Sequence, residues 1–509
     1  MLYTEELWTR YVVKVEDNFK IKTYPHFDPY FNFPKDKDQL HVLVKDITGK
    51  SIAEHSFLPL IKILIKTPRY RYQENEKNYN LETKIRPISF ASHFDNYIYG
   101  FYSFAINEIY QQYIRKNGFD DCVLAYRSDL DGKCNIQFAK EVFDNIKSQK
   151  LCSAIALDIK GYFDNIDHEI LKEKWCKVIG KDKLPDDQYK IYRTLTKYSY
   201  VNKNSVLKHF EINLNKLKKQ KVYWQSLLDL IPDEIAGNSF KDKFNLLRRD
   251  NLIVTNKPKK NKDGSIIFKG IPQGSAMSAL LSNIYLIDFD KYLKELGIKI
   301  GFSYRRYCDD LIVVCPTDKV NEIKDIIIKE ILNKYNLIIQ DKKTEIIDFK
   351  PNEKGFIRGF KRIFDKETNL YNTLENNEIN YKNLQYLGFE FNGQKTYIRP
   401  GSLSRYFRKM KGRIVKSVMM AYSKNSKSSV INKQQIYHRY SHLGKRNFLQ
   451  YAYNASKKYY KNSEGKIREG LDSSSIKRQI SAHFSIIEQE IRKTSEQRAG
   501  QLKKTKIKY

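Results

Sequence analysis

Residues 304–315 constrain the fold of this chain more than any other stretch. They read Tyr-Arg-Arg-Tyr-Cys-Asp-Asp-Leu-Ile-Val-Val-Cys, so Asp309 and Asp310 lie beside an apolar, β-branched run. We expect a β-hairpin with both aspartates at its turn, at the rim of a buried sheet. Desolvation and mutual repulsion penalise two such charges unless a cation compensates them. Mg²⁺ suits this place because it takes carboxylate oxygens and keeps positions open for phosphates. A plain turn is the alternative, because aspartate favours turns.

The composition predicts a large, globular and basic protein. Its 509 residues, 41% of them hydrophobic, allow roughly three domains with sizeable cores. The formal net charge is +33, and residues 395–509 hold 28 Lys or Arg against 6 Asp or Glu. Such a surface indicates a polyanionic partner, and the 13% aromatic content adds faces on which bases can stack. A solvated surface in a lysine-rich protein is the alternative.

The cysteines and the apolar runs bear on the compartment. The six cysteines are scattered without Cys-x-x-Cys pairs, which indicates neither a zinc site nor a disulfide framework. We therefore expect a reduced, cytoplasmic protein. The first residues lack the basic and apolar regions of a secretion signal, and apolar runs such as residues 58–65 are too short to span a bilayer. No membrane partner is expected.

The first part of the chain contains two regions of different character. Residues 1–80 mix aromatic and polar side chains and end in the polar run 73–80, which indicates an N-terminal extension closed by a linker or loop. Helical spacing of apolar residues then predicts helices at 96–115 and 136–146.

The rest of the chain alternates strands and helices before it becomes helical. The apolar stretch 151–158 predicts a buried strand with Asp158 at its carboxyl end, and Asp167 precedes a helix. Residues 180–265 are lysine-rich and weakly periodic, as expected of an insertion-bearing helical region. Further predicted elements are a turn at 270–274, helices at 278–286 and 320–335, strands at 337–349 and 384–391, and helices at 402–422, 433–460 and 473–493.

A second acidic block begins where the predicted strand ends. Residues 157–168 read Leu-Asp-Ile-Lys-Gly-Tyr-Phe-Asp-Asn-Ile-Asp-His. At a strand end, Asp158 can join Asp309 around two metal ions, and such a clamp stabilises the attacking and leaving oxygens of an in-line phosphoryl displacement. Phe163, five residues further on, is then expected beneath a ribose.

Three blocks in this order resemble the reverse transcriptases, most closely the bacterial ones. They are residues 157–168, Pro272-Gln273-Gly274 and the Tyr-x-Asp-Asp hairpin. The resemblance covers roughly residues 81–395 and implies an α+β, right-hand polymerase fold. Its implied parts are an N-terminal extension at 1–80, fingers at 81–150, a palm at 151–395 with a small antiparallel sheet and an insertion at 180–265, and a basic α-helical thumb or RNA-binding region at 396–509.

The resemblance also implies roles for single residues of the palm. Asp158, Asp309 and Asp310 would be the catalytic carboxylates that hold two Mg²⁺ ions, with Mn²⁺ as a substitute. Phe163 matches the bulky residue that excludes a 2′-hydroxyl and favours deoxynucleotides; an ordinary core aromatic is its alternative. Gln273 and Gly274 match the turn that contacts the template and the incoming nucleotide, where glycine allows close backbone approach.

Further roles are implied outside these blocks. Lys84 and Arg86 resemble the basic fingers residues that hold the triphosphate, a task suited to arginine's fork. Lys343 resembles the lysine near the leaving phosphate. The implied nucleic-acid contacts are Tyr307 in the acidic hairpin, Leu387 and Gly388 in the hairpin that grips the primer, and Lys445 and Arg446 in the thumb.

Within the bacterial enzymes, this chain is most similar to the defence-associated reverse transcriptases. The similar segments are Tyr24-Pro25-His26-Phe27-Asp28, Leu124-Ala125-Tyr126-Arg127 and Lys445-Arg446-Asn447-Phe448. The His-Asn-His nuclease module of group II intron enzymes and the Val-Thr-Gly element of retron enzymes are not found. The resemblance implies antiphage immunity in a bacterial cytoplasm, through cDNA synthesis from deoxynucleotides on a partner noncoding RNA. It also admits a homo-oligomeric ribonucleoprotein.

Three other functions compete with this prediction. An RNA-dependent RNA polymerase shares the paired aspartates but needs a polar residue near the ribose hydroxyl, so Phe163 argues against it. A catalytically silent RNA-binding scaffold does not need Asp158, Asp309 and Asp310 intact. The same active site could also make untemplated or repetitive DNA, primed on a protein hydroxyl; 37 tyrosines offer candidates, Tyr509 among them, and the sequence singles out none.

Overall fold

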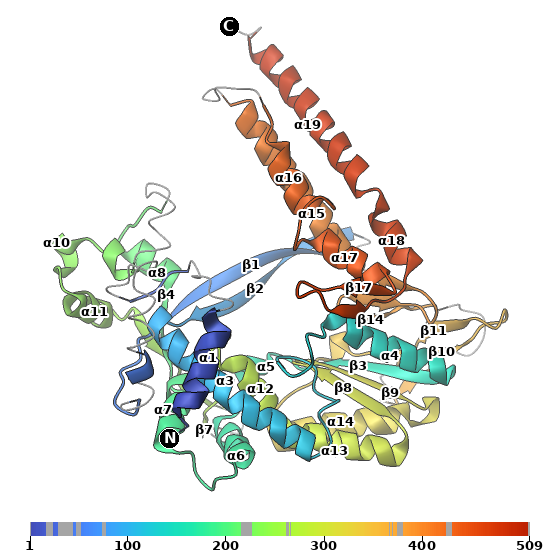
Figure 1. Cartoon of the computed structure of the whole chain (residues 1–509), viewed down its shortest axis with the longest axis horizontal. Coiled ribbons are helices and arrows are strands. Elements are labelled where there is room, and N and C mark those ends of the chain that lie inside the picture. Colours follow the sequence, from blue (N-terminus) through green and yellow to red (C-terminus); the bar gives the residue numbers. More distant parts are fainter. Residues whose placement is uncertain are drawn as a thin grey trace.

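The computed structural model is an α+β protein (Figure 1). It describes residues 2–16, 24–28, 44–46, 52–73, 78–214, 226–260, 264, 266–365, 367–368, 370–373, 380–423 and 430–506. In this part of the chain, no helix combines the length and the hydrophobicity that a membrane crossing requires.

Five antiparallel strands form the central sheet, in the order β11-β10-β3-β9-β8. Ile155 and Leu157 of β3 pack into one core. Cys152 and Ala154 of the same strand pack into a second core on the other face. Both faces of β3 are therefore covered, which explains its apolar sequence. The bounds are β3 (Cys152–Asp158), β8 (Ser303–Tyr307), β9 (Asp310–Cys315), β10 (Glu345–Pro351) and β11 (Ile357–Lys361).

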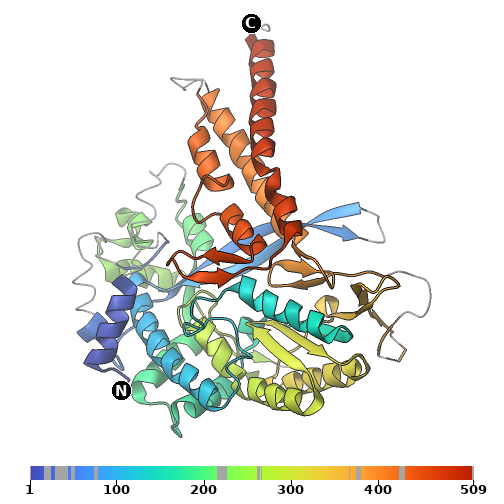
Figure 2. The same ribbon diagram turned by 45° about the vertical axis from the view of Figure 1, so that its right-hand side comes forward.

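Helices cover both faces of this sheet (Figure 2). The first core joins the sheet to α1, α3, α6, α7, α12, α13 and α14, and the second joins it to α4 and to C-terminal elements. These helices are α1 (Glu5–Glu16), α3 (His93–Lys116), α4 (Asn135–Gln149), α6 (His168–Ile179), α7 (Asp186–Thr196), α12 (Ser278–Tyr285), α13 (Ile287–Ile300) and α14 (Val320–Tyr335), with the short α5 (Tyr162–Asn165) after β3.

A second sheet has the order β2-β1-β4-β5. Its strands are β1 (Leu60–Gln73), β2 (Asn78–Phe90), β4 (Ser199–Asn202) and β5 (Ile253–Thr255). β1 and β2 form a long antiparallel ribbon, and β4 runs parallel to β1. Ile61, Val201 and Leu247 belong to a third core, which packs this sheet against the helices that follow. Those helices are α8 (Lys203–His209), α10 (Asp233–Ala236) and α11 (Phe240–Arg249).

The C-terminal part projects from the rest of the molecule as a group of helices, α15, α16 and α19 (Figure 1). Met410, Ile436 and Ile487 belong to the small core that holds these three helices together. The elements of this part are β14 (Leu384–Tyr386), β15 (Phe389–Phe391), β16 (Thr396–Ile398), α15 (Pro400–Ala421), α16 (Lys433–Tyr440), α17 (Phe448–Ser456), α18 (Ser474–Ser481) and α19 (His483–Lys506).

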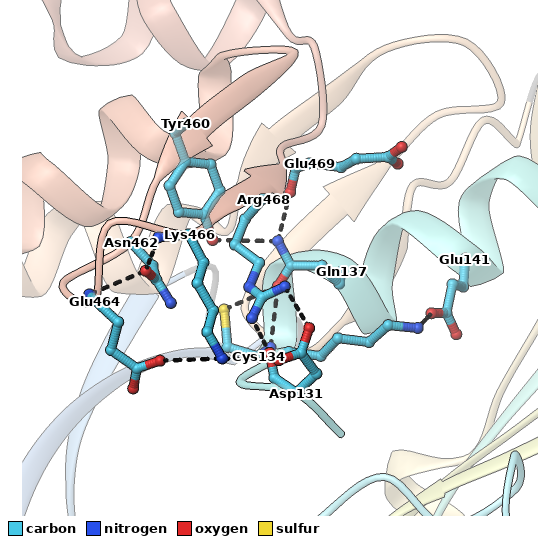
Figure 3. A network of polar contacts seen from close by, with 11 residues as sticks. Asp131, Cys134, Gln137, Glu141, Tyr460, Asn462, Glu464, Lys466, Arg468 and Glu469 are labelled. Atoms are coloured by element: carbon cyan, nitrogen blue, oxygen red, sulfur yellow. Dashed lines mark hydrogen bonds and ion pairs between the residues drawn. The ribbon is translucent and has the colours of Figure 1, made fainter. Parts of the chain in front are cut away.

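A short hairpin, β17 (Tyr459–Lys461) and β18 (Ile467–Glu469), ties the C-terminal part to the start of α4 (Figure 3). Arg468 Nη1 lies 2.9 Å from Asp131 Oδ2, and Lys466 Nζ lies 3.1 Å from Asp131 Oδ1. The Gln137 amide donates to the Tyr460 hydroxyl over 3.1 Å. The pKa of Asp131 is lowered to about 2, chiefly by the hydrogen bonds from Arg468 and Lys466.

Most of the predicted elements are confirmed, and several boundaries are corrected. The boundary expected at residue 80 falls inside β2, so the polar run before it belongs in part to a strand. Residues 180–265 contain the expected helices, α7, α8, α10 and α11, and in addition β4 and β5, which join the sheet of β1 and β2. The single helix expected at 433–460 is wrong: α16 and α17 are separate, and β17 follows. Of the predicted strand 337–349, only the part from Glu345 is a strand.

Candidate active site

The three predicted catalytic aspartates lie at one rim of the central sheet. Asp158 is the last residue of β3, and its cross-strand neighbour is Asp310, the first residue of β9. Asp309 lies in the turn before β9, and its carbonyl accepts a 3.0 Å hydrogen bond from the Ile159 amide. The antiparallel pairing of β3 and β9 therefore brings together carboxylates that are about 150 residues apart in sequence.

A buried ion pair holds the turn that carries Asp309. The Arg306 side chain is 0% exposed, and its Nε and Nη2 donate to the two Asp290 carboxylate oxygens over 2.8 and 2.6 Å. Arg306 Nη1 also donates to the Cys308 carbonyl over 3.2 Å. Cys308 has a φ of 60°, a left-handed conformation that is costly for a side chain other than glycine. Arg306 therefore fixes the strained residue directly before Asp309.

The electrostatics of the rim favour a cation. Desolvation, followed by the charge of Asp158, raises the pKa of Asp309. Desolvation and the charges of Asp309 and Asp158 raise the pKa of Asp310 to about 6. In this structure the Lys343 ammonium lies 2.6 Å from Asp158 Oδ1 and supplies one positive charge. The turn that carries Lys343 is held in place by the Gln340 amide, which donates to the Asp158 carbonyl over 2.8 Å.

The donor set at this rim fits a hard divalent cation, because it consists of carboxylate oxygens whose mutual repulsion a cation would relieve. The three aspartates do not have ligand atoms within 4.8 Å of one another. Among the described residues, only His26, Asp28 and His93 form a group whose potential ligand atoms all lie within 4.8 Å of one another. Asp28 Oδ2 accepts from the His93 amide over 2.8 Å, so this carboxylate caps the start of α3.

Phe163 and the turn around Gln273 lie side by side. The half-buried Phe163 is in α5, directly after the rim, and its carbonyl accepts a 2.9 Å hydrogen bond from the Ile271 amide. The Gln273 carbonyl accepts a 2.8 Å hydrogen bond from the Ser89 amide of β2. The segment that the sequence predicts beneath the ribose is therefore joined through the 271–273 turn to the β1–β2 ribbon.

Gly274 lies where the turn meets the ribbon most closely. Its φ is 116°, and a Cβ added to it would be 2.7 Å from the Ser89 carbonyl oxygen and 2.9 Å from Ile88 Cγ2. Both facts require glycine. Lys84 and Arg86 are half-buried and share the face of β2 that carries Ile88, because side chains alternate along a strand. The two basic residues therefore lie on the face that meets the turn.

Three further predicted nucleic-acid contacts are Tyr307, Leu387 and Gly388. Tyr307 of β8 is the cross-strand neighbour of Asp310. Leu387 and Gly388 form the turn between β14 and β15, with φ values of 46° and 92°. The Leu387 carbonyl accepts a 2.9 Å hydrogen bond from the side-chain amide of Asn135 in α4. This turn is therefore fixed to the same helix that holds the β17–β18 hairpin.

Lys445 and Arg446 are exposed in the segment between α16 and α17. Arg446 has a φ of 56°, and its amide donates to Gln450 Oε1 over 2.5 Å. The structure therefore displays both side chains from a constrained loop of the C-terminal part, rather than from the helix expected there.

Three residues of this region are not among the sequence-based candidates. Arg306 and Asp290 support the acidic turn from within the core. Arg399 lowers the pKa of Asp310 against the larger effects of desolvation and of Asp309, and its amide donates to the Gly388 carbonyl over 3.0 Å. A signal for Arg306 exists in the alternation of β8, where Tyr304 and Arg306 point inward and Arg305 is more exposed.

Part of the chain matches a known protein family. Residues 209–391 match the family model described as "Reverse transcriptase (RNA-dependent DNA polymerase)". The match includes Gln273, Gly274, Asp309, Asp310 and Lys343, and Asp158 precedes it. No curated protein matches the chain.

Solved structures similar to this chain include three telomerases from yeasts of the genus Candida. They are telomerase from Candida albicans in complex with a TWJ fragment of telomeric RNA (TM-score 0.33, 12% identity, 82% of this chain and 56% of that chain), apo telomerase from Candida tropicalis (0.33, 12%, 81% and 57%) and telomerase from Candida tropicalis with such a fragment (0.34, 12%, 90% and 68%). The chain spans little more than half the length of the first two. By the family match, residues 209–391 are similar to a reverse transcriptase domain, and the mixed α+β architecture of the chain fits a right-hand polymerase fold.

Proposed function

We propose that this protein makes cDNA from a partner noncoding RNA by nucleotidyl transfer with two divalent metal ions. The observation that carries the proposal is the pairing of Asp158 with Asp310 across β3 and β9, with Asp309 in the adjoining turn. This arrangement gathers three carboxylates at the open rim of a sheet that is otherwise buried on both faces. A catalytically silent scaffold would gain no stability from such a cluster, because its charges repel one another.

Each residue of the rim has a proposed role. Mg²⁺ ions, or Mn²⁺ in their place, would stabilise the charge on the attacking and leaving oxygens. Asp158 and Asp309 bind these ions, and Asp310 supports them. Lys343 holds Asp158 in the present structure and would contact the leaving phosphate once Asp158 binds metal.

The neighbouring elements would bind the substrates. Lys84 and Arg86 of the fingers hold the triphosphate of a deoxynucleotide, while Phe163 excludes a 2′-hydroxyl. Gln273 and Gly274 contact the template and the incoming base. The remaining nucleic-acid contacts in the palm and thumb are Tyr307, Leu387, Gly388, Lys445 and Arg446.

We further propose that the enzyme acts in antiphage defence in a bacterial cytoplasm, with its RNA in a ribonucleoprotein that can be homo-oligomeric. Two of the segments that resemble defence-associated enzymes are built into the fold around the site. Asp28 caps α3, and the Leu124 amide donates to the Arg306 carbonyl over 3.0 Å. These contacts support the view that both segments belong to the polymerase itself.

The test is to purify the protein from cells with its native flanking DNA. The bound RNA is sequenced, and so is the DNA made after addition of deoxynucleotides and Mg²⁺. A discrete noncoding RNA together with its DNA complement would support the proposal. DNA of simple repeated composition would favour untemplated or repetitive synthesis, with a primer to be mapped on the protein. RNA without any DNA product would contradict the enzymatic proposal and favour the scaffold.

A further inference from the structure

A cavity of about 680 Å³ lies between α14, the 3₁₀ turn η4 (Asp341–Lys343) and the hairpin of β12 (Ile363–Phe364) and β13 (Tyr371–Asn372). Its volume is within the range of small-molecule sites, about 300–1,000 Å³. None of the predicted catalytic or substrate-binding residues is part of its described lining. Its ligand would therefore be bound by a separate set of side chains.

Lysines give the cavity its positive charge. Lys324 is 4% exposed, and its ammonium lies 3.1 Å from Asp325 Oδ1. Burial of an ammonium is costly, so this group needs neighbours that stabilise it. Lys329 follows one helical turn after Asp325, and Lys342 belongs to η4; both are exposed and line the cavity. Three ammonium groups thus line one space, against the carboxylates of Asp325 and Asp341.

An aromatic wall faces these lysines. The rings of Phe364 and Tyr371 lie 5.0 Å apart between centroids. The Lys324 ammonium lies 5.1 Å from the centroid of Tyr371 and 6.0 Å from that of Phe364. The Tyr371 amide donates to Asn321 Oδ1 over 3.0 Å, which holds the wall against α14. Phe364 nevertheless remains 42% exposed and lines the cavity.

This combination matches one ligand chemistry. Aromatic faces stack on nucleobases, and lysine ammonium groups bind phosphates as point charges. Asp325 and Asp341 supply acceptors for the amino and hydroxyl groups of a base or a ribose. We propose that this cavity binds a free nucleoside triphosphate, with its base against Phe364 and Tyr371 and its phosphates towards Lys329 and Lys342. This second nucleotide site goes beyond the proposed function and does not depend on it.

The cavity is joined to the candidate active site through η4. Lys342 and Thr344 line the cavity, and Lys343 between them contacts Asp158 at 2.6 Å. The Gln340 amide, just before η4, donates to the Asp158 carbonyl. A ligand that contacts Lys342 therefore acts on the same short turn that places Lys343. Ligand binding would move Lys343 only if the ligand bound one conformation of this turn more tightly than another.

The test is isothermal titration calorimetry of the full chain with ATP in the presence of EDTA. ATP is the probe because its 2′-hydroxyl is excluded from the proposed polymerase site by Phe163, and EDTA removes the divalent ions which that site requires. Phe364→Ala and Lys342→Met alter exposed side chains of the cavity, so both variants should fold. Lys334→Met is the matched control, because Lys334 is an exposed lysine at the end of α14 and does not line the cavity.

We expect one ATP per chain, with affinity at least about fivefold lower in Phe364→Ala, as for a lost base-stacking contact. Lys342→Met should also weaken ATP binding, and Lys334→Met should leave it unchanged. Absence of saturable binding to the unaltered chain, or equal affinity in all variants, would overturn the proposal. If competition showed that inorganic phosphate binds the cavity as tightly as ATP does, the proposal would also be overturned, because the aromatic wall would then contribute nothing to the affinity.

A nucleotide within an RNA strand offers the same chemistry as free ATP, so a parallel titration uses a short oligoadenylate. Stronger binding of ATP than of the oligoadenylate would support a site for free nucleotides. Binding of the oligoadenylate alone, weakened by Phe364→Ala, would contradict it and assign the cavity to RNA. Since every readout is binding, the results stand whether or not the chain polymerises DNA.

Discussion

The Arg306 guanidinium and the Asp290 carboxylate form a two-pronged ion pair that is wholly buried beneath the turn carrying Asp309. Asp290 lies in α13 and Arg306 in β8, so the pair fixes a helix to the acidic hairpin. The Tyr304 hydroxyl also donates to Asp290 over 2.8 Å. The turn thus rests on a polar contact inside an apolar core, where the loss of one partner leaves the other charge unpaired.

Arg306→Met should therefore destabilise the central sheet by about 3–5 kcal/mol, the usual cost of breaking a buried pair. Denaturant unfolding followed by fluorescence measures this cost. Arg305→Met is the control, because Arg305 is the neighbouring residue and its side chain is 23% exposed. The double variant Arg306→Met/Asp290→Leu should recover much of the loss, since it removes both charges. Equal stabilities of Arg306→Met and Arg305→Met would contradict the role given to the pair.

Gly274→Ala should separate the 271–274 turn from the β1–β2 ribbon. The added Cβ would meet the Ser89 carbonyl oxygen at 2.7 Å, and a φ of 116° is unfavourable for alanine. We expect a loss of nucleotide incorporation on the order of 100-fold, as for a misplacement near 1 Å, together with a lower melting temperature. Steady-state incorporation kinetics test this. Gly412→Ala, at a helical glycine with open space around it, should behave like the unaltered protein.

The sequence predicts β3 and β9 well because both are apolar and covered on both faces, whereas β11 is not predicted and β10 begins later than expected. Residues 152–158 and 310–315 are short apolar runs of the length typical of buried strands, and Asp167 accepts from the amides of Glu169 and Ile170 as an N-cap does. β3 ends with Asp158 and β9 begins with Asp310, so their antiparallel pairing places the two carboxylates opposite each other.

What the sequence does not reveal depends on contacts between distant residues. β4 is four residues long and gains its place from parallel pairing with β1, about 140 residues earlier. The break between α16 and α17 has a local cause instead, since a Cβ at Gly444 would collide with the His438 carbonyl six residues earlier, and the helical prediction for 433–460 overlooked this glycine. A signal for the β17–β18 hairpin was present in Gly465, whose φ is 78°, and in Asn462, which accepts from the amides of Glu464 and Lys466.

Phe163→Ala should admit ribonucleotides, because the half-buried ring is held directly after the rim by the bond between its carbonyl and the Ile271 amide. The ratio of kcat/KM for a deoxynucleotide to that for the matching ribonucleotide should fall by at least about tenfold, the discrimination expected from one steric contact in a pocket. Phe163→Leu keeps bulk at this position and should retain most of the selectivity. Unchanged sugar selectivity in Phe163→Ala would assign the ring to packing alone.

Removal of the charges of Lys445 and Arg446 should weaken nucleic-acid binding and flatten its salt dependence. Both side chains are exposed in the loop between α16 and α17. If each side chain contacts one phosphate, the magnitude of the negative slope of log affinity against log salt should decrease by about 2 in the double variant Lys445→Gln/Arg446→Gln. Fluorescence anisotropy at several salt concentrations measures the slope. A double variant of the exposed Lys181 and Lys183, before α7, is the control; the same slope in both variants would show that the loop does not contact phosphates.

The most direct test of the polymerase assignment compares Asp309→Ala with Asp318→Ala, an exposed aspartate after β9. Extension of a DNA primer on an RNA template is measured with Mg²⁺, and RNA binding is measured in parallel. We expect Asp309→Ala to abolish incorporation while RNA binding stays within about twofold, because metal ligation is lost and the basic surface is kept. Asp318→Ala should be fully active. Primer extension by Asp309→Ala at the rate of the unaltered protein would contradict the central claim.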